Sequence, residues 1–228
     1  MKGYEFTYRP GAFFGTFIQV SAPRTPGKFG EAPREESIAE MLSTEHAIIE
    51  RLMSVFEAMI GRACMDSNVD LMPLNHAAIM IKELGPDHHM KFEEDHVFPK
   101  FRNAGRLSDL VGVLKQQHDR GASILNSIID MTRTGRIEDE RSLNQLSNLC
   151  MSFVVMYRLH AAREETELFP ALYDACSNDE MRDLADRMRD YQQKILGDKG
   201  LHRLIDKLSE IESVAGTSDL SRFTPPPG

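Results

Sequence analysis

The stretch His160–Pro170 reads HAAREETELFP, and a second copy of its pattern, HMKFEEDHVFP, occupies His89–Pro99. Both copies follow H-x-x-x-E-E-x-x-x-F-P in the same register. Residues four apart lie on one face of a helix, with their side chains about 5–6 Å apart, so each His and the first Glu after it can reach a common point. Metal sites inside helix bundles are built from such pairs on facing helices. The doubled motif therefore predicts a helical protein with a metal site between its helices.

Two further helices each carry a single His within an apolar stripe. Ser37–Glu40 has the form of a capping box, which opens a helix. The stripe that follows alternates by four and three residues and consists of Ile38, Leu42, His46, Ile49, Met53, Phe56 and Ile60. The stripe after the turn at 103–106 consists of Val111, Leu114, His118, Leu125, Ile128 and Met131. A lone His on an apolar face is more often a hydrogen-bonded core residue than a ligand, but the two motifs favour ligands here.

The motifs themselves fall on two long helical regions. The first runs over about 69–102 and contains Gly85-Pro86, which predicts a kink or two abutting helices because proline lacks a backbone donor. This break either aims His89 or is merely tolerated. The second runs over about 138–175, and its buried stripe includes His160 and Glu164. A buried carboxylate without a partner costs several kcal/mol or takes up a proton, so a cation is the simplest partner for these glutamates.

The candidate ligands come to four imidazoles and two carboxylates: His46, His89, Glu93, His118, His160 and Glu164. Such a set suits two metal ions that share bridging carboxylates. Iron is the usual occupant of mixed nitrogen and oxygen sites in helix bundles.

On these residues, together with Phe98-Pro99 and Phe169-Pro170, the sequence resembles the hemerythrin-like family, also called the HHE cation-binding domain. The resemblance covers roughly 36–176 and implies an all-α, up-down-up-down four-helix bundle. The Pro- and Gly-rich stretch 1–35 is expected to be an extended N-terminal arm, with a flexible tail as the alternative. A C-terminal extension with two additional helices is expected over 177–228. The resemblance further implies a non-haem centre of two iron ions with an oxo or hydroxo bridge, one ion held by His46 and His89, the other by His118 and His160, with Glu93 and Glu164 bridging.

The chain departs from the oxygen-carrying members of that family in two respects. Those proteins carry a second His one turn from the first on the third helix, where this chain has Leu114 and Ala122. They also place the last carboxylate five residues after its His, which is Glu165 here, although symmetry with Glu93 favours Glu164. Fewer protein ligands favour redox chemistry on dioxygen, nitric oxide or peroxide, for detoxification or sensing. The alternatives are an oxygen or iron storage or sensing module without turnover, and a metal-free or zinc-filled scaffold.

Several other side chains lie near the predicted site. His96 and Glu167 occupy equivalent places in the two copies and could pair, add a ligand or donate protons, or simply form a polar pair at the mouth of the bundle. Tyr157 could hydrogen-bond a bound oxygen species, though a buried Tyr usually just packs. The carboxylates that follow the bridging residues could accept hydrogen bonds from ligating His; these are Glu94 and Glu165. The remaining histidines are expected to face outward: His76, His88 and His202.

Composition narrows the partners. The 228 residues carry a formal net charge of −8 with a pI of about 5.5, which disfavours nucleic acid. No segment approaches the roughly 20 apolar residues of a membrane span, and the stretch 12–20 makes a poor signal peptide. The three Cys residues show no metal-binding spacing, and reduced thiols fit a cytoplasmic protein. The expected partner is a small molecule.

Overall fold

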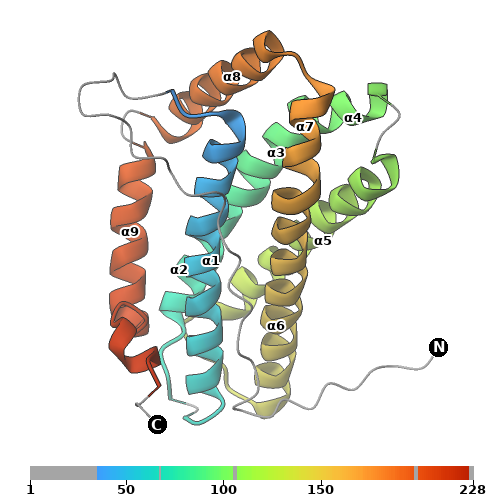
Figure 1. Cartoon of the computed structure of the whole chain (residues 1–228). Coiled ribbons are helices and arrows are strands. Elements are labelled where there is room, and N and C mark those ends of the chain that lie inside the picture. The colour runs from blue at the N-terminus through green and yellow to red at the C-terminus, as the bar shows by residue number, and fades with distance from the viewer. Residues whose placement is uncertain (1–34, 67, 105–106, 198–199, 226–228) are drawn as a thin grey trace, which may run out of the picture. The chain divides into compact units, whose positions relative to one another are not determined.

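The computed structural model describes residues 35–66, 68–104, 107–197 and 200–225, so the predicted N-terminal arm lies outside the described residues except for Glu35. Within these ranges the chain is helical and contains no strand. The chain folds as the expected hemerythrin-like helical bundle with extra helices after it (Figure 1). None of the described helices is both long enough and apolar enough to cross a membrane.

The first helix, α1 (Ile38–Ala63), begins at the predicted capping box. The backbone N–H of Glu40 donates to the Ser37 hydroxyl, and the Glu40 carboxylate accepts from the Ser37 backbone N–H at 2.9 Å. All seven members of the predicted stripe are buried, including His46. Period and cap together therefore orient α1 so that His46 points into the bundle.

The second helical region continues through Gly85-Pro86 instead of breaking there. Its successive segments are α2 (Met72–Leu84), the π-helical turn η1 (Gly85–His89), α3 (Met90–Phe92), a second π-helical turn η2 (Glu93–Val97) and α4 (Phe98–Ala104). In η2 the N–H of Phe98 donates to the carbonyl of Glu93, five residues back. The next residue, Pro99, cannot donate and its ring crowds the preceding turn, so the widened turn keeps the chain helical.

The other motif repeats this backbone device. After α5 (Ser108–Thr132) come α6 (Glu140–Arg163), the π-helical turn η3 (Glu164–Leu168) and α7 (Phe169–Ala175). The N–H of Phe169 donates to the carbonyl of Glu164 just before Pro170, as in the first copy. Single π-turns inside α-helices often mark functional sites, and here η2 and η3 each begin at a candidate bridging glutamate.

Two apolar clusters sandwich the predicted site. One is built around Phe56 and Phe153 and the other around Phe98 and Phe169. On α1 the boundary between the clusters falls between Leu42 and Ile48, and His46 lies at that boundary. His89, His118 and Glu164 likewise lie between members of the two clusters, and Glu93 and His160 lie next to the boundary, so the donors form one polar layer inside an otherwise apolar core.

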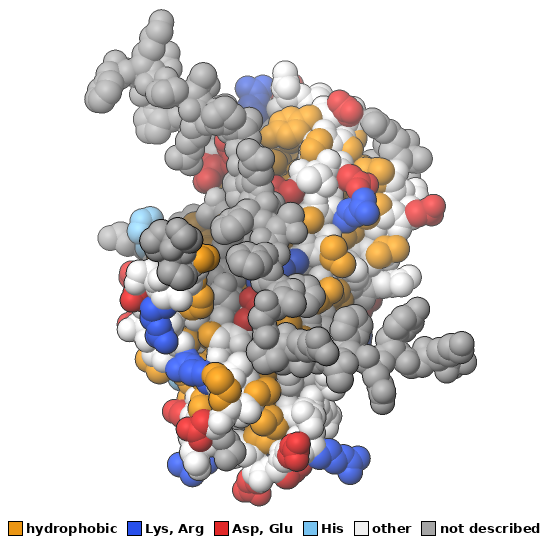
Figure 2. All heavy atoms as spheres, turned by 60° about the horizontal axis from the view of Figure 1, so that its bottom comes forward, with side chains coloured by type: hydrophobic (Ala, Val, Ile, Leu, Met, Phe, Trp, Pro, Cys, Tyr) orange, Lys and Arg blue, Asp and Glu red, His pale blue; other side chains and the backbone are white. Residues whose placement is uncertain are grey.

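In the described part of the chain, two α-helices follow the bundle, α8 (Asn178–Leu196) and α9 (Gly200–Ala215), and a short 3-10 helix, η4 (Leu220–Phe223), comes after them. Ser177 caps α8 with a second capping box. Helix α9 packs along α1 and α2, where Arg51 donates two hydrogen bonds of 2.8 and 2.6 Å to Glu212 (Figure 1). On the face shown in Figure 2, Lys and Arg side chains are scattered among Asp and Glu rather than gathered into one patch.

Candidate metal centre

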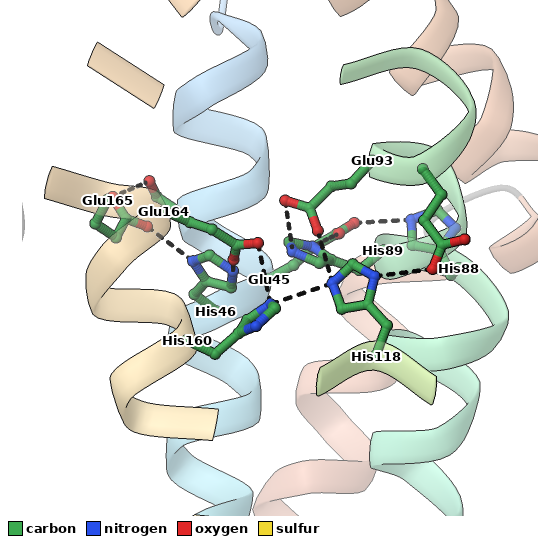
Figure 3. Close-up of polar contacts among 11 residues, drawn as sticks. Glu45, His46, His88, His89, Glu93, His118, His160, Glu164 and Glu165 are labelled. Carbon is green, nitrogen blue, oxygen red and sulfur yellow. Dashed lines mark hydrogen bonds and ion pairs between the residues drawn. The ribbon is translucent and has the colours of Figure 1, made fainter. Parts of the chain in front are cut away.

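The structure brings the six predicted side chains together in the polar layer (Figure 3). They come from four separate parts of the bundle, because α1, α5 and α6 each supply one His and the second helical region supplies another. The two glutamates lie at the first positions of η2 and η3. All six side chains are buried.

Each glutamate spans two histidines. One oxygen of Glu93 lies 3.5 Å from Nε2 of His89, and its other oxygen lies 3.5 Å from Nε2 of His118. Glu164 repeats the arrangement, with its two oxygens 3.2 and 3.0 Å from Nε2 of His46 and His160. Each carboxylate thus faces one His of each predicted metal position, as a carboxylate that bridges two metal ions would.

The donors therefore form two groups of four that share both glutamates. One group contains His46 and His89, the other His118 and His160, and each is completed by Glu93 and Glu164. Within each group the ligand atoms lie within 4.8 Å of one another. Two nitrogens and two oxygens at such separations can surround one metal ion.

The outer nitrogen of every candidate His faces an oxygen. Nδ1 of His46 lies 2.9 Å from Glu165, and Nδ1 of His118 lies 3.0 Å from Glu94, which are the two outer partners that the sequence suggested. Nδ1 of His89 lies 2.8 Å from Glu45, and Nδ1 of His160 lies 3.0 Å from the Gln117 side-chain oxygen. An acceptor at Nδ1 holds the proton there in a neutral ring and turns the Nε2 lone pair inward.

Most of the inward atoms face one another without forming a hydrogen bond. Among the described residues, both oxygens of Glu93 and of Glu164 and the Nε2 atoms of His46 and His89 are buried with no hydrogen bond. The Nε2 atoms of His118 and His160 face each other at 3.2 Å, where two lone pairs would repel unless a proton or a cation lay between them. Buried unpaired groups of this kind are costly, so the donor set fits metal ions.

The pKa values of the buried histidines and glutamates also show that the site favours positive charge beside its carboxylates. Burial opposes the charged form of His46 and His89, but the carboxylates of Glu164 and Glu93 outweigh it and raise the pKa of both rings. Burial also opposes ionisation of Glu164, yet His160 and His46 lower its pKa well below the ordinary value. The raised pKa values of His46 and His89 favour protons on these rings beside the carboxylates, and metal ions would replace such protons.

Sequence reasoning missed Glu45, which is fully buried and accepts from both His88 and His89 at 2.8 Å. The prediction that His88 faces outward is wrong, because the π-turn η1 aims two consecutive histidines at one carboxylate (Figure 3). A signal for Glu45 was present: it follows Leu42 by three residues and precedes Ile49 by four, so it shares a buried face of α1. Gln117, also missed, precedes His118 as Glu45 precedes His46.

The remaining candidates take other roles. Tyr157 is buried next to the site, with its ring centre 6.1 Å from that of His46, and its hydroxyl has no hydrogen-bond partner among the described residues. Glu167 forms an ion pair with Arg163, and His96 packs on Phe92 with ring centres 4.7 Å apart. Neither His96 nor Glu167 belongs to the two donor groups. The other two histidines expected at the surface, His76 and His202, are exposed.

Comparison with known proteins agrees with this geometry. The family model of the hemerythrin HHE cation-binding domain matches residues 37–172. Uncharacterized proteins of Mycobacterium bovis and of two strains of Mycobacterium tuberculosis are 33% identical over 209 residues, which are 90% of this chain and 82% of each relative. No solved structure gives a significant match. The chain belongs to the hemerythrin HHE cation-binding family.

Proposed function

We propose that this protein holds two iron ions between its helices and binds a small oxidant there, either dioxygen, nitric oxide or peroxide. One observation carries the proposal: two groups of four inward-facing donors share Glu93 and Glu164, and each carboxylate faces a His of both groups. We assign His46 and His89 to one ion and His118 and His160 to the other. Iron suits this mixture of imidazole and carboxylate better than the cations that prefer oxygen alone.

The protein would offer four donor side chains to each ion, namely two imidazoles together with Glu93 and Glu164. Iron commonly accepts more donors than four, so positions remain for an exchangeable ligand. Burial of the site limits the size of this exchangeable ligand, because His46 is 6% exposed, His118 3% and both glutamates 0%. A site so enclosed favours molecules of two or a few atoms over a bulky substrate.

Iron, when bound, supplies electrons and Lewis acidity toward such an oxidant. The chain supplies the surroundings: the two apolar clusters keep bulk water away, and the outer acceptors hold each imidazole in place. Tyr157 brings a buried hydroxyl that has no partner among the described residues. We assign to it a hydrogen bond to the bound small molecule.

A sensor must pass a change at the metal site to another part of the protein, such as the helices after the bundle, whereas a detoxifying enzyme need not. One contact favours sensing as a second candidate: Gln192 of α8 donates to Glu45 at 2.8 Å, and Glu45 in turn bonds His89. A change at the metal could thus reach α8 through two hydrogen bonds. Turnover of peroxide or nitric oxide by the loaded protein would favour detoxification, and binding without turnover would favour sensing or storage.

The test is metal content together with the optical spectrum of protein purified from iron-supplemented cells. We expect about two irons per chain and near-ultraviolet charge-transfer absorption, both lost in the Glu93→Ala, Glu164→Ala double variant. His76→Ala changes an exposed histidine outside the donor groups and serves as the matched control. One zinc per chain, or no metal at all, would overturn the proposal in favour of a structural scaffold.

A further inference from the structure

We infer that the two metal positions are unequal, and that the position between His118 and His160 binds its ion less tightly and releases it first. This inference deepens the proposed function and rests on it, since it concerns the two ions placed there. It is carried by the groups that accept the Nδ1 hydrogen bonds of the four histidines. These groups differ in charge and in exposure between the two halves.

At the position between His46 and His89, the Nδ1 atoms of both histidines bond to carboxylates. Nδ1 of His89 bonds Glu45, which is fully buried and is held further by His88 and Gln192. Nδ1 of His46 bonds Glu165, whose side chain is 18% exposed and accepts a second hydrogen bond from Ser43 at 2.9 Å. Both imidazoles at this position therefore form their Nδ1 hydrogen bond with a carboxylate that is largely shielded from water.

At the position between His118 and His160, the groups bonded to Nδ1 carry less negative charge. Nδ1 of His118 bonds Glu94, but the other oxygen of Glu94 forms an ion pair of 2.7 Å with Lys115, and the Glu94 side chain is 27% exposed. Nδ1 of His160 bonds only the neutral amide oxygen of Gln117. The Nδ1 atom of His160 thus has no anion behind it, and the anion behind Nδ1 of His118 is partly offset by a lysine.

The difference arises at equivalent positions of the internal repeat. Glu45 precedes His46 and bonds the motif residue His89, whereas Gln117 precedes His118 and bonds the motif residue His160. Glu and Gln have nearly the same shape, so the two halves differ here by charge rather than by geometry.

A carboxylate behind a ligating His raises the basicity of the imidazole, and its loss typically lowers metal affinity by about 10–100-fold. An amide oxygen orients the ring without adding negative charge. We therefore expect the ion at His118 and His160 to be released about tenfold faster, or more, than its neighbour.

The experiment is stopped-flow release of iron from iron(II)-loaded protein, kept free of oxygen and mixed with an excess of a chromogenic iron(II) chelator. The wild type is expected to release iron in two phases of similar amplitude. Gln117→Glu should slow the fast phase by about tenfold and leave the slow phase unchanged. Gln116→Glu adds the same charge at the exposed neighbouring position and should leave both phases unchanged.

The reciprocal variant Glu165→Gln should accelerate the slow phase, because it removes the anion behind His46. A single release phase in the wild type would overturn the inference while leaving the two-iron site intact. So would equal effects of the Gln117 and Gln116 variants, or an effect of Gln117→Glu on the slow phase alone. Protein that takes up fewer than two irons would instead overturn the proposed function.

Discussion

Replacing Glu45 by Gln removes a buried charge on which two helical segments converge. The carboxylate is fully buried and accepts hydrogen bonds of 2.8 Å from His88, His89 and Gln192. Burial alone would raise the pKa of Glu45, but the hydrogen bonds from His88 and His89 overcome this and lower it from 4.5 to about 2. The amide of Gln has nearly the same shape but cannot accept all of these bonds.

The pKa shift sets the size of the effect. A lowering from 4.5 to about 2 corresponds to about 3 kcal/mol of folding free energy at neutral pH, because one pKa unit is worth about 1.4 kcal/mol. Breaking a buried ion pair typically costs about 3–5 kcal/mol, which agrees. Because the folded-state pKa is the lower one, this stability is present above pH 4.5 and is lost as the pH falls toward 2.

The assay is urea unfolding of chelator-treated protein at several pH values. At about pH 6 we expect Glu45→Gln to be less stable than the wild type by about 3 kcal/mol, and the gap should narrow below about pH 4. Asp95→Asn is the matched control, because Asp95 is half exposed in its pair with Lys91 and such pairs are worth little. A gap below about 1 kcal/mol at pH 6, or one that does not change with pH, would refute the reasoning.

Three further predictions concern the metal, the oxidant and the core. Metal uptake should weaken as the pH falls through the raised pKa values of His46 and His89, because protons then compete for Nε2; titration with iron(II) at several pH values checks this, and pH-independent affinity would contradict it. Tyr157→Phe should retain both irons but bind nitric oxide about fivefold more weakly, since one hydrogen bond is worth about 1 kcal/mol; unchanged binding would remove Tyr157 from the site. Phe56→Ala should lower the free energy of unfolding by about 3–5 kcal/mol through the cavity it leaves, measured by urea unfolding, whereas a loss below about 1 kcal/mol would mean that the core closes around the gap.

Much of the bundle could be predicted from the sequence because helical burial is a local, periodic property. The stripe from Ile38 to Ile60 and the one containing His160 and Glu164 lie in the core as expected, and the capping box at Ser37 starts α1. The candidate donors were chosen for the same reason: polar residues on a buried face need partners. The period of the apolar residues shows which face of a helix is buried, but not which residues of other helices pack against that face.

The proline breaks were harder to predict. A Gly85-Pro86 step predicts an interruption, but whether the chain kinks, ends or widens into a π-turn depends on what packs around it. The π-turn η1 rotates His88 inward toward Glu45, and an α-helical register cannot anticipate that rotation. The outward assignment of His88 failed on this point.

The sequence by itself determined the helical class of this protein, the doubled motif and the buried faces on which the six polar side chains lie, since all of these follow from spacing along single helices. Only the tertiary structure decided which groups stand behind the histidines, because these pairs join residues far apart in the chain, such as His46 with Glu165 and His160 with Gln117. Their meeting depends on the rotation and stagger of neighbouring helices, which no single helix encodes. The inequality of the two halves, Glu45 in one and Gln117 in the other, became visible only once those contacts were in place.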